Sequence, residues 1–234
     1  MNDAWLYGGL LLVGGGTGMG MRVEYDAELE DVSRVLVEMA DEVRRAMGQA
    51  TASLLGVDAE QAEEVISADA IVNGLRQRVE DRVYGLLARQ SPVASDLRLL
   101  FTALHIATDL ERMGDLAKHV AKIGLRRHPF PAVPEELISI VTDMAVVADR
   151  IAGKISAILA APDPHDAAAL EAEDDEMDRL NEGLFVLLLG AAWRHGVESA
   201  IDGAMLGRFY ERYADHAVNA GRQMYFLVTG EPLR

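Results

Sequence analysis

The sequence predicts an all-α protein built from two tandem antiparallel three-helix bundles, six helices in all, related by an internal duplication. From residue 22 onward Ala, Leu, Glu, Arg and Met dominate, and alternating β-branched runs are missing. Apolar residues recur at steps of three and four, the spacing of bundle helices that pack along one stripe. Residues 39–75 align with residues 144–180 without a gap, at an offset of 105. One of the apolar stripes consists of Leu206, Tyr210, Tyr213 and Ala217.

Turn-forming residues divide this helical sequence into its elements. A turn is expected at residues 56–58, and Ser91-Pro92 is typical of a helix N-cap followed by proline at the first helical position. Residues 128–134 contain three of the seven prolines and cannot continue a helix. Further turns are expected at residues 161–164 and 193–196. The predicted helices are residues 22–56, 59–89, 92–126, 135–160, 165–192 and 197–229.

The domain organisation follows from these breaks and from the duplication. Residues 21–127 are predicted to form a first three-helix bundle, residues 128–134 a proline-rich linker and residues 135–230 a second three-helix bundle. Past the second helix of each half the offset falls from 105 to 100, which indicates a shorter connection in the second half. Residues 1–20 are apolar and rich in glycine, without the basic start of a signal peptide or the length of a membrane span. We interpret them as a disordered or artefactual extension, with Met21 as the natural start.

Composition narrows the classes of function. The chain has 234 residues and a formal net charge of −16, a balance that repels nucleic acid and anionic lipid headgroups. It favours metal cations or basic partner surfaces instead. The absence of cysteine excludes disulfides, thiolate metal sites and cysteine nucleophiles. The sequence also lacks a phosphate-binding loop with lysine, a nucleophile-elbow serine and a Glu-x-x-His pair. We therefore expect a protein that is not an enzyme, with no nucleic-acid partner and no direct insertion into a membrane.

The most informative motif is a pair of carboxylates that occurs twice, one hundred residues apart. Glu111 and Asp115 are separated by four residues, and so are Glu211 and Asp215. Four residues are about one helical turn, so each pair leaves one face of its helix. This face lies roughly 160° from the apolar stripe of the same helix. We therefore expect both pairs on the back of their bundle, outside the core.

A second set of acidic residues flanks the apolar stripes of the second and fifth predicted helices. Asp69 is followed four residues later by Asn73, and Asp174 by Asp178. Where these helices approach the third and the sixth, each half could gather three or four oxygen ligands. Oxygen donors suit hard or borderline cations such as magnesium, calcium, manganese and iron. The sequence therefore raises the hypothesis of a metal site in each half.

Simpler interpretations compete with a metal site. Acid pairs four residues apart are common on solvated helix faces, although repetition in both halves weakens that interpretation. Arg112 and Arg212, each beside its glutamate, could neutralise the acids by internal ion pairs. His119 and His216 lie near the acid pairs and are interpreted as packing or solvent-exposed histidines rather than ligands.

A second apolar stripe on the third predicted helix bears on the oligomeric state. Leu97, Leu100 and Leu104 lie opposite the first stripe of that helix. They predict either the interface of a homodimer or a contact with the other half of the same chain.

Three segments resemble the PhoU family, the accessory proteins of the phosphate-specific transport system. They are Glu-Arg-Met-Gly-Asp-Leu-Ala at 111–117, Glu-Arg-Tyr-Ala-Asp-His-Ala-Val-Asn at 211–219, and Arg-Gln-Ser-Pro-Val-Ala-Ser-Asp-Leu-Arg at 89–98. The likeness covers residues 22–229, in the right order and duplication. It implies two three-helix bundles, often assembled as a homodimer.

The resemblance implies a function in phosphate homeostasis. PhoU proteins negatively regulate phosphate uptake and phosphate-starvation signalling by linking the phosphate ABC transporter, through its ATPase subunit, to a membrane sensor histidine kinase. They are cytoplasmic and reach the inner face of the membrane through these partners. An alternative is a metal-binding or metal-storing helical protein, or a metal-dependent enzyme, that uses the same carboxylates.

The resemblance also implies a cofactor, because some members bind multinuclear iron or zinc clusters, with magnesium or manganese as alternatives. The ligand motifs fall on these residues: Glu111, Asp115, Glu211 and Asp215, with Asp69, Asp174 and Asp178 as neighbours. Two positions depart from the family pattern. Asn73 replaces an aspartate, and His119 stands where Asn219 keeps the usual asparagine. Metal binding is therefore expected more in the second half than in the first.

Overall fold

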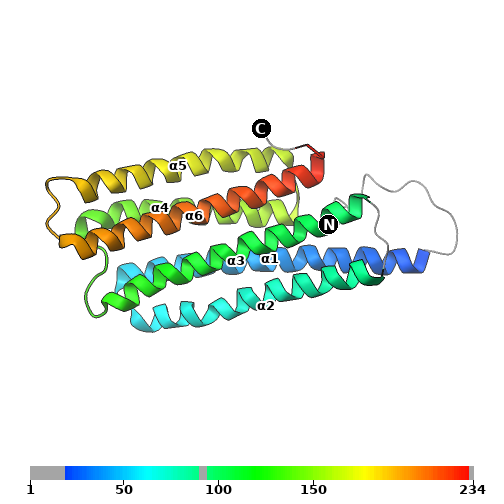
Figure 1. The fold of residues 1–234 in the computed structure, drawn as a ribbon, viewed down its shortest axis with the longest axis horizontal. Coiled ribbons are helices and arrows are strands. Elements are labelled where there is room, and N and C mark those ends of the chain that lie inside the picture. Colours follow the sequence, from blue (N-terminus) through cyan, green and yellow to red (C-terminus); the bar gives the residue numbers. More distant parts are fainter. Residues whose placement is uncertain (1–18, 90–93, 232–234) are drawn as a thin grey trace.

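The computed structural model describes residues 19–89 and 94–231, and these residues form six α-helices (Figure 1). Three predicted helix ends move by two or three residues, and the expected cap at Ser91-Pro92 lies outside the described residues, as do residues 1–18. The all-α fold class is confirmed. The helices are α1 Met19–Gly56, α2 Ala59–Arg89, α3 Ala94–Arg127, α4 Glu135–Ala160, α5 Pro164–Leu189 and α6 Gly196–Thr229.

The helix ends follow from local chemistry. The Asp58 carboxylate accepts a hydrogen bond from the Gln61 backbone N–H at 3.0 Å, which satisfies a free donor in the first turn of α2. Asp163 caps α5 in the same way through His165, with a proline at the first helical position. Gly230 ends α6 with φ of 76°, a left-handed conformation that glycine adopts without strain.

The helices form two layers of three. Helices α1, α2 and α3 pack as one bundle and α4, α5 and α6 as the other, while α1 packs against α4 and α3 against α6 (Figure 1). Buried apolar residues from all six helices form one continuous core. Leu100 belongs to this core and Leu104 packs against it, so the second apolar stripe of α3 contributes to packing within the chain.

In the contact between α3 and α6, the same two positions of each half meet those of the other half. Asn219 Nδ2 donates a hydrogen bond to Asp109 Oδ2 at 2.6 Å. At the positions aligned by the offset of 100, the His119 ring stacks on Phe209 with centroids 5.3 Å apart. Because each half offers the same two positions to the other, and α3 and α6 run in opposite directions, the halves have an approximate two-fold relation. The duplication therefore extends from sequence to packing.

Two buried tyrosines of α6 join the second bundle to the first. The Tyr210 hydroxyl lies 2.6 Å from Thr51 Oγ1 of α1, and the Tyr213 hydroxyl donates to the Val43 carbonyl at 3.2 Å. Both rings belong to the apolar stripe predicted for this helix, and both are fully buried. Their hydroxyl groups are therefore satisfied across the boundary between the bundles, as buried polar groups require.

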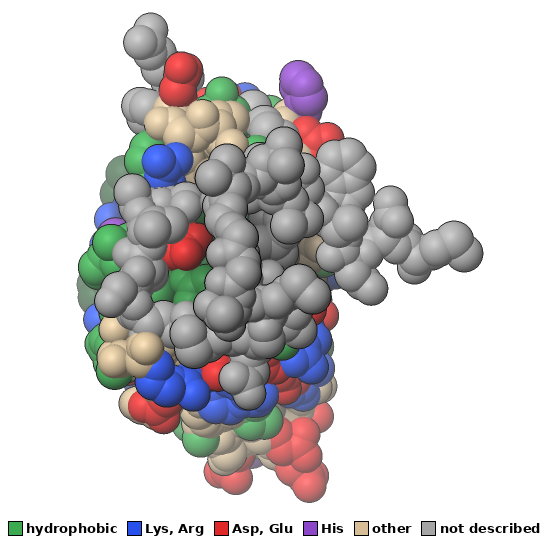
Figure 2. Space-filling model, turned by 90° about the vertical axis from the view of Figure 1, so that its right-hand side faces the viewer, with side chains coloured by type: hydrophobic (Ala, Val, Ile, Leu, Met, Phe, Trp, Pro, Cys, Tyr) green, Lys and Arg blue, Asp and Glu red, His purple; other side chains and the backbone are tan. Residues whose placement is uncertain are grey.

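Acidic and basic side chains alternate at the end of the molecule where α1 begins (Figure 2). Lys and Arg side chains lie directly beside Asp and Glu side chains in this view. Between α1 and α2, Arg89 Nη2 lies 2.7 Å from Glu28 Oε2, and Arg82 pairs with Asp31. In the first bundle the acidic composition is therefore offset locally by ion pairs between helices.

Candidate functional site

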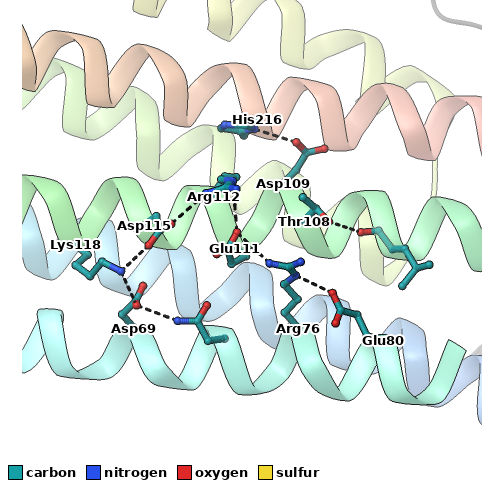
Figure 3. Close-up of polar contacts among 12 residues, drawn as sticks. Asp69, Arg76, Glu80, Thr108, Asp109, Glu111, Arg112, Asp115, Lys118 and His216 are labelled. Atoms are coloured by element: carbon teal, nitrogen blue, oxygen red, sulfur yellow. Dashed lines mark hydrogen bonds and ion pairs between the residues drawn. The ribbon is translucent and has the colours of Figure 1, made fainter. Parts of the chain in front are cut away.

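The predicted acidic residues of the first half lie between α2 and α3 (Figure 3). Glu111 and Asp115 leave α3 toward α2, and Asp69 of α2 lies opposite them. They sit outside the apolar core, as expected, but they are only partly exposed to solvent. The side chain of Glu111 is 12% exposed and that of Asp69 is 13% exposed. Carboxylates this close together and this covered require a neutralising group.

A lysine supplies that group in the first half. Lys118 Nζ lies 2.7 Å from Asp69 Oδ2 and 2.5 Å from Asp115 Oδ1, so it bridges the two helices (Figure 3). Asn73 Nδ2 donates to the same Asp69 oxygen at 3.0 Å. These hydrogen bonds raise the pKa of Lys118 against the opposing effect of burial, which is the largest single influence. The ammonium group thus takes the place that a bound cation would need.

We define the first cluster as Asp69, Glu111 and Asp115. Two arginines also lie close to these carboxylates. Arg76 Nη1 of α2 lies 3.6 Å from Glu111 Oε2. Arg112 Nε lies 3.7 Å from the same oxygen, and its Nη1 lies 3.5 Å from Asp115 Oδ2. The internal ion pairs considered for Arg112 are therefore present, while Arg76 and Lys118 had not been singled out from the sequence.

The equivalent residues of the second half also come together, between α5 and α6, but with fewer ion pairs. We define the second cluster as Asp174, Asp178, Glu211 and Asp215. Among the described residues no lysine, arginine or histidine forms an ion pair with Asp174, Asp178 or Asp215. Glu211 alone is paired, with Arg208 Nη1 at 2.5 Å. The Arg212 ion pair considered from the sequence is not formed among these residues.

The electrostatics of the second cluster reflect its few ion pairs, although Arg222 partly offsets the shift at Asp174. Burial, with repulsion from Asp215 and Asp178, raises the pKa of Asp174 to about 6. Burial likewise raises the pKa of Asp178 above its usual value, assisted by Glu211 and Asp215. Both shifts mean that the folded protein holds protons more tightly here than the unfolded chain does. The cluster can therefore accept a proton or an external cation.

Two substitutions between the repeats explain why the clusters differ. Val218 occupies the position equivalent to Lys118, and it is buried. Asn181 occupies the position equivalent to Arg76; its amide nitrogen donates to Glu211 Oε2 at 3.3 Å, and its Oδ1 is buried without a partner. The second half thus has neutral side chains in place of Lys118 and Arg76, while it keeps the acids.

Replacing Asp174 with asparagine is expected to raise the free energy of unfolding by about 1–2 kcal/mol at pH 7, after allowance for solvent screening. The raised pKa of Asp174 makes the folded state bind more protons than the unfolded state between about pH 4 and pH 6. Its destabilising effect therefore grows as the pH rises through that interval. Urea unfolding at pH 4, 5, 6 and 7 measures both the gain and its pH dependence.

Asp69→Asn is the matched control for this prediction. Asp69 is paired with Lys118, so its neutralisation is expected to lower the free energy of unfolding by about 1 kcal/mol at pH 7. Changes of the same sign in the two variants would contradict the assigned difference between the clusters.

The histidines near the acid pairs belong to the boundary between the bundles. His216 Nδ1 lies 2.9 Å from Asp109 Oδ1, and Asn219 donates to the other oxygen of this carboxylate. His119 stacks on Phe209. His119 and Asn219, which follow Asp115 and Asp215 by four residues, therefore lie at the α3–α6 contact and not in a cluster. Asp109, a buried acid, was not recognised from the sequence.

As placed, the described residues do not contain a group of three or more His, Asp or Glu side chains that could hold a metal ion. The first cluster does not fit a metal, because Lys118 and Arg76 already occupy it. In the second cluster Arg208 pairs with Glu211, while the other three carboxylates form no ion pair among the described residues. None of the helices described here is long and apolar enough to cross a membrane.

The fold and the clusters together define a duplicated helical-bundle protein that carries a carboxylate cluster between the last two helices of each half. The PhoU domain, as a family model, matches residues 36–124 and 141–224, which is one match in each half. The chain belongs to the PhoU family. The resemblance seen in the acidic motifs is confirmed.

Known relatives agree over nearly the whole chain. Two Mycobacterium tuberculosis proteins, the phosphate-specific transport system accessory protein PhoU homologs 2 and 1, are each 43% identical over 210 residues. The alignments cover 90% of this chain and 99% and 95% of those relatives. The crystal structure of PhoU from Pseudomonas aeruginosa superposes with a TM-score of 0.80 at 26% identity, covering 88% of this chain and 100% of that one.

Proposed function

We propose that this protein negatively regulates phosphate uptake and phosphate-starvation signalling, as an adaptor between the phosphate ABC transporter and a sensor histidine kinase. The observation that supports it most is the match to accessory proteins of the phosphate-specific transport system over nearly their full length. The adaptor acts from the cytoplasm, at the inner face of the membrane, by binding the ATPase subunit and the kinase. It acts by binding and not by catalysis.

Deleting the gene tests this function. In a strain that lacks every PhoU-type gene, phosphate uptake and phosphate-starvation gene expression are expected to remain high in phosphate-rich medium. All such genes must be removed because M. tuberculosis has two homologs of this kind. Restoring only the present gene should return uptake to its repressed level. Normal repression in the deletion strain, or no effect of restoring the gene, would contradict the proposal.

We further propose that metal binding, where it occurs, is confined to the second half. Asp174, Asp178, Glu211 and Asp215 would hold iron or zinc, with magnesium or manganese as alternatives. Three of these carboxylates form no ion pair among the described residues, which supports this assignment. A metal store or a metal-dependent enzyme would use the same residues. Elemental analysis of protein purified without chelator separates these two functions from the adaptor. A metal-free preparation that still binds its partners excludes both the metal store and the metal-dependent enzyme. We also propose that the protein forms a homodimer. Sedimentation of the same preparation tests this assembly.

A further inference from the structure

Several large apolar side chains are exposed to solvent where α5 ends and α6 begins. Leu189 is 83% exposed, Val197 is 75% exposed and Ile201 is 56% exposed. A protein surface rarely exposes so many neighbouring apolar groups unless another molecule covers them. We name this surface the hairpin patch. It consists of Phe185, Val186, Leu189, Val197, Ile201 and Met205.

Comparison with the first half shows that the fold does not require all of this apolar surface. The positions equivalent to Phe185, Val186 and Met205 are polar in the first half. They are Glu80, Asp81 and His105. Of the remaining three residues, Leu189 and Ile201 stand where the first half has the exposed Tyr84 and Phe101. Val197 stands where the first half has Leu97. The second half, which lacks counterparts of Lys118 and Arg76, therefore also has a larger exposed apolar surface.

The hairpin patch and the second cluster lie along one surface formed by α5 and α6, which we name the α5–α6 surface. Asp174, Asp178 and Phe185 are separated by four and seven residues, and Leu189 follows after four more, so all four lie on one face of α5. That face adjoins α6, because the Asp174 carboxylate is close enough to Asp215 to be repelled by it. At 1.5 Å per residue the stretch from Leu189 to Asp174 is about 22 Å long. A helix of about 15 residues would cover it.

We propose that the α5–α6 surface is a docking site for a basic amphipathic helix of a partner protein. The apolar residues of that helix, at steps of three and four, would cover the hairpin patch. Its Lys or Arg side chains, two to four turns further on, would lie against the second cluster. Lys118 shows within the same chain how a cation satisfies the equivalent acids. Apolar burial would supply affinity, and the charges would supply orientation and selectivity.

Charge complementarity is the reason for this choice of occupant. Asp174, Asp178 and Asp215 have no ion-pair partner among the described residues, so a covering helix without basic side chains would bury them at a large cost. An anionic lipid surface is repelled by the same carboxylates. The inference rests on the proposed function for the partner, which we take to be the ATPase subunit of the phosphate transporter.

The test measures binding of the purified full chain to that ATPase subunit by titration calorimetry. Serine at Leu189 and Ile201 together is expected to weaken binding about tenfold or more. Serine at the equivalent Tyr84 and Phe101 is the matched control, and a change of less than about twofold is expected because the first half carries its own cations. Circular dichroism of both variants checks that they remain folded.

Neutralising the acids tests the second part of the proposal. With asparagine at both Asp174 and Asp178, binding is expected to weaken and to lose part of its dependence on salt, because fewer charges are screened at the interface. The two serine variants should keep the salt dependence of the wild type to the extent that they still bind.

The outcomes separate the docking surface from the proposed function. Equal binding by the wild type and the Leu189/Ile201 variant would overturn the docking surface and leave the function intact. A change of sedimentation from dimer to monomer in that variant alone would also overturn the docking surface, since the patch would then be the contact with a second copy of this chain. Failure of the wild type to bind either the ATPase subunit or the cytoplasmic part of the kinase would overturn the proposed function, and with it the partner assigned to this surface.

Discussion

Replacing Tyr213 with alanine is expected to lower the free energy of unfolding by about 3–5 kcal/mol, the usual cost of removing a buried aromatic side chain. Tyr213 is fully buried on the core side of α6. Its hydroxyl donates to the Val43 carbonyl of α1, so the substitution removes both apolar packing and a hydrogen bond between the bundles. Urea unfolding followed by circular dichroism measures the loss. A variant within about 1 kcal/mol of the wild type would contradict the assigned role.

Two controls divide this loss into its parts. Tyr213→Phe keeps the ring and removes only the hydroxyl, so a loss of about 1 kcal/mol is expected. Met113 is the equivalent buried residue of the first half, and Met113→Ala is expected to cost about 2–5 kcal/mol through packing alone. Because one apolar core includes both bundles, each variant should still unfold in a single transition.

The same tyrosines predict the behaviour of the protein in alkali. Burial raises the pKa of Tyr210 to about 12, and it raises the pKa of Tyr213 further still above its usual value. The unfolded chain releases these phenolic protons near pH 10, so the folded state binds more protons above that pH. Stability is therefore lost as the pH rises above about 10, and Tyr213→Phe should lose less of it.

The helices could be predicted because their signals are local. Apolar steps of three and four, and prolines that cannot continue a helix, depend only on neighbouring residues, and the stripe containing Tyr210 and Tyr213 was identified correctly on this basis. How the two halves pack against each other was not predictable. A duplication states that two copies exist, but the contact of Asp109 with His216 and Asn219 depends on the angle and register between α3 and α6.

The acidic positions of both clusters could be predicted, and the groups around them could not. Periodicity placed Glu111 and Asp115 outside the core, but it could not show that α2 covers them. Lys118 follows Asp115 by three residues, so a one-turn pairing was visible in the sequence. Its reach across to Asp69 depends on the packing of α2 against α3. The comparison of Lys118 with Val218 was the available signal for the difference between the clusters, and it required the alignment of the repeats.

Replacing Lys118 with methionine is expected to lower the free energy of unfolding by about 1–3 kcal/mol, because two partly buried carboxylates lose the cation they share. The raised pKa of Lys118 gives the sign of the pH dependence. The contribution of this lysine is fully present below its ordinary pKa near 10.5, and it is lost as the pH rises through the higher value of the folded state. Urea unfolding at pH 7 and at pH 11 should therefore show a large and then a smaller difference from the wild type.

The reciprocal substitution, Val218→Lys, places an ammonium group at the equivalent position of the second cluster. There it should lower the pKa of Asp174 from about 6 toward its ordinary value, which carboxyl ¹³C NMR titration can follow. If the proposed docking helix supplies this cation in nature, the added lysine should also weaken binding of the ATPase subunit, by neutralising the acids that the helix needs. An unchanged pKa of Asp174 in a folded Val218→Lys protein would contradict the equivalence of the two clusters. One exchanged residue would then have failed to convert one cluster into the other. The difference between the halves would have to come from the closer packing of α6 on α5, where a Cβ at Gly207 would lie 2.4 Å from Asn181 Oδ1.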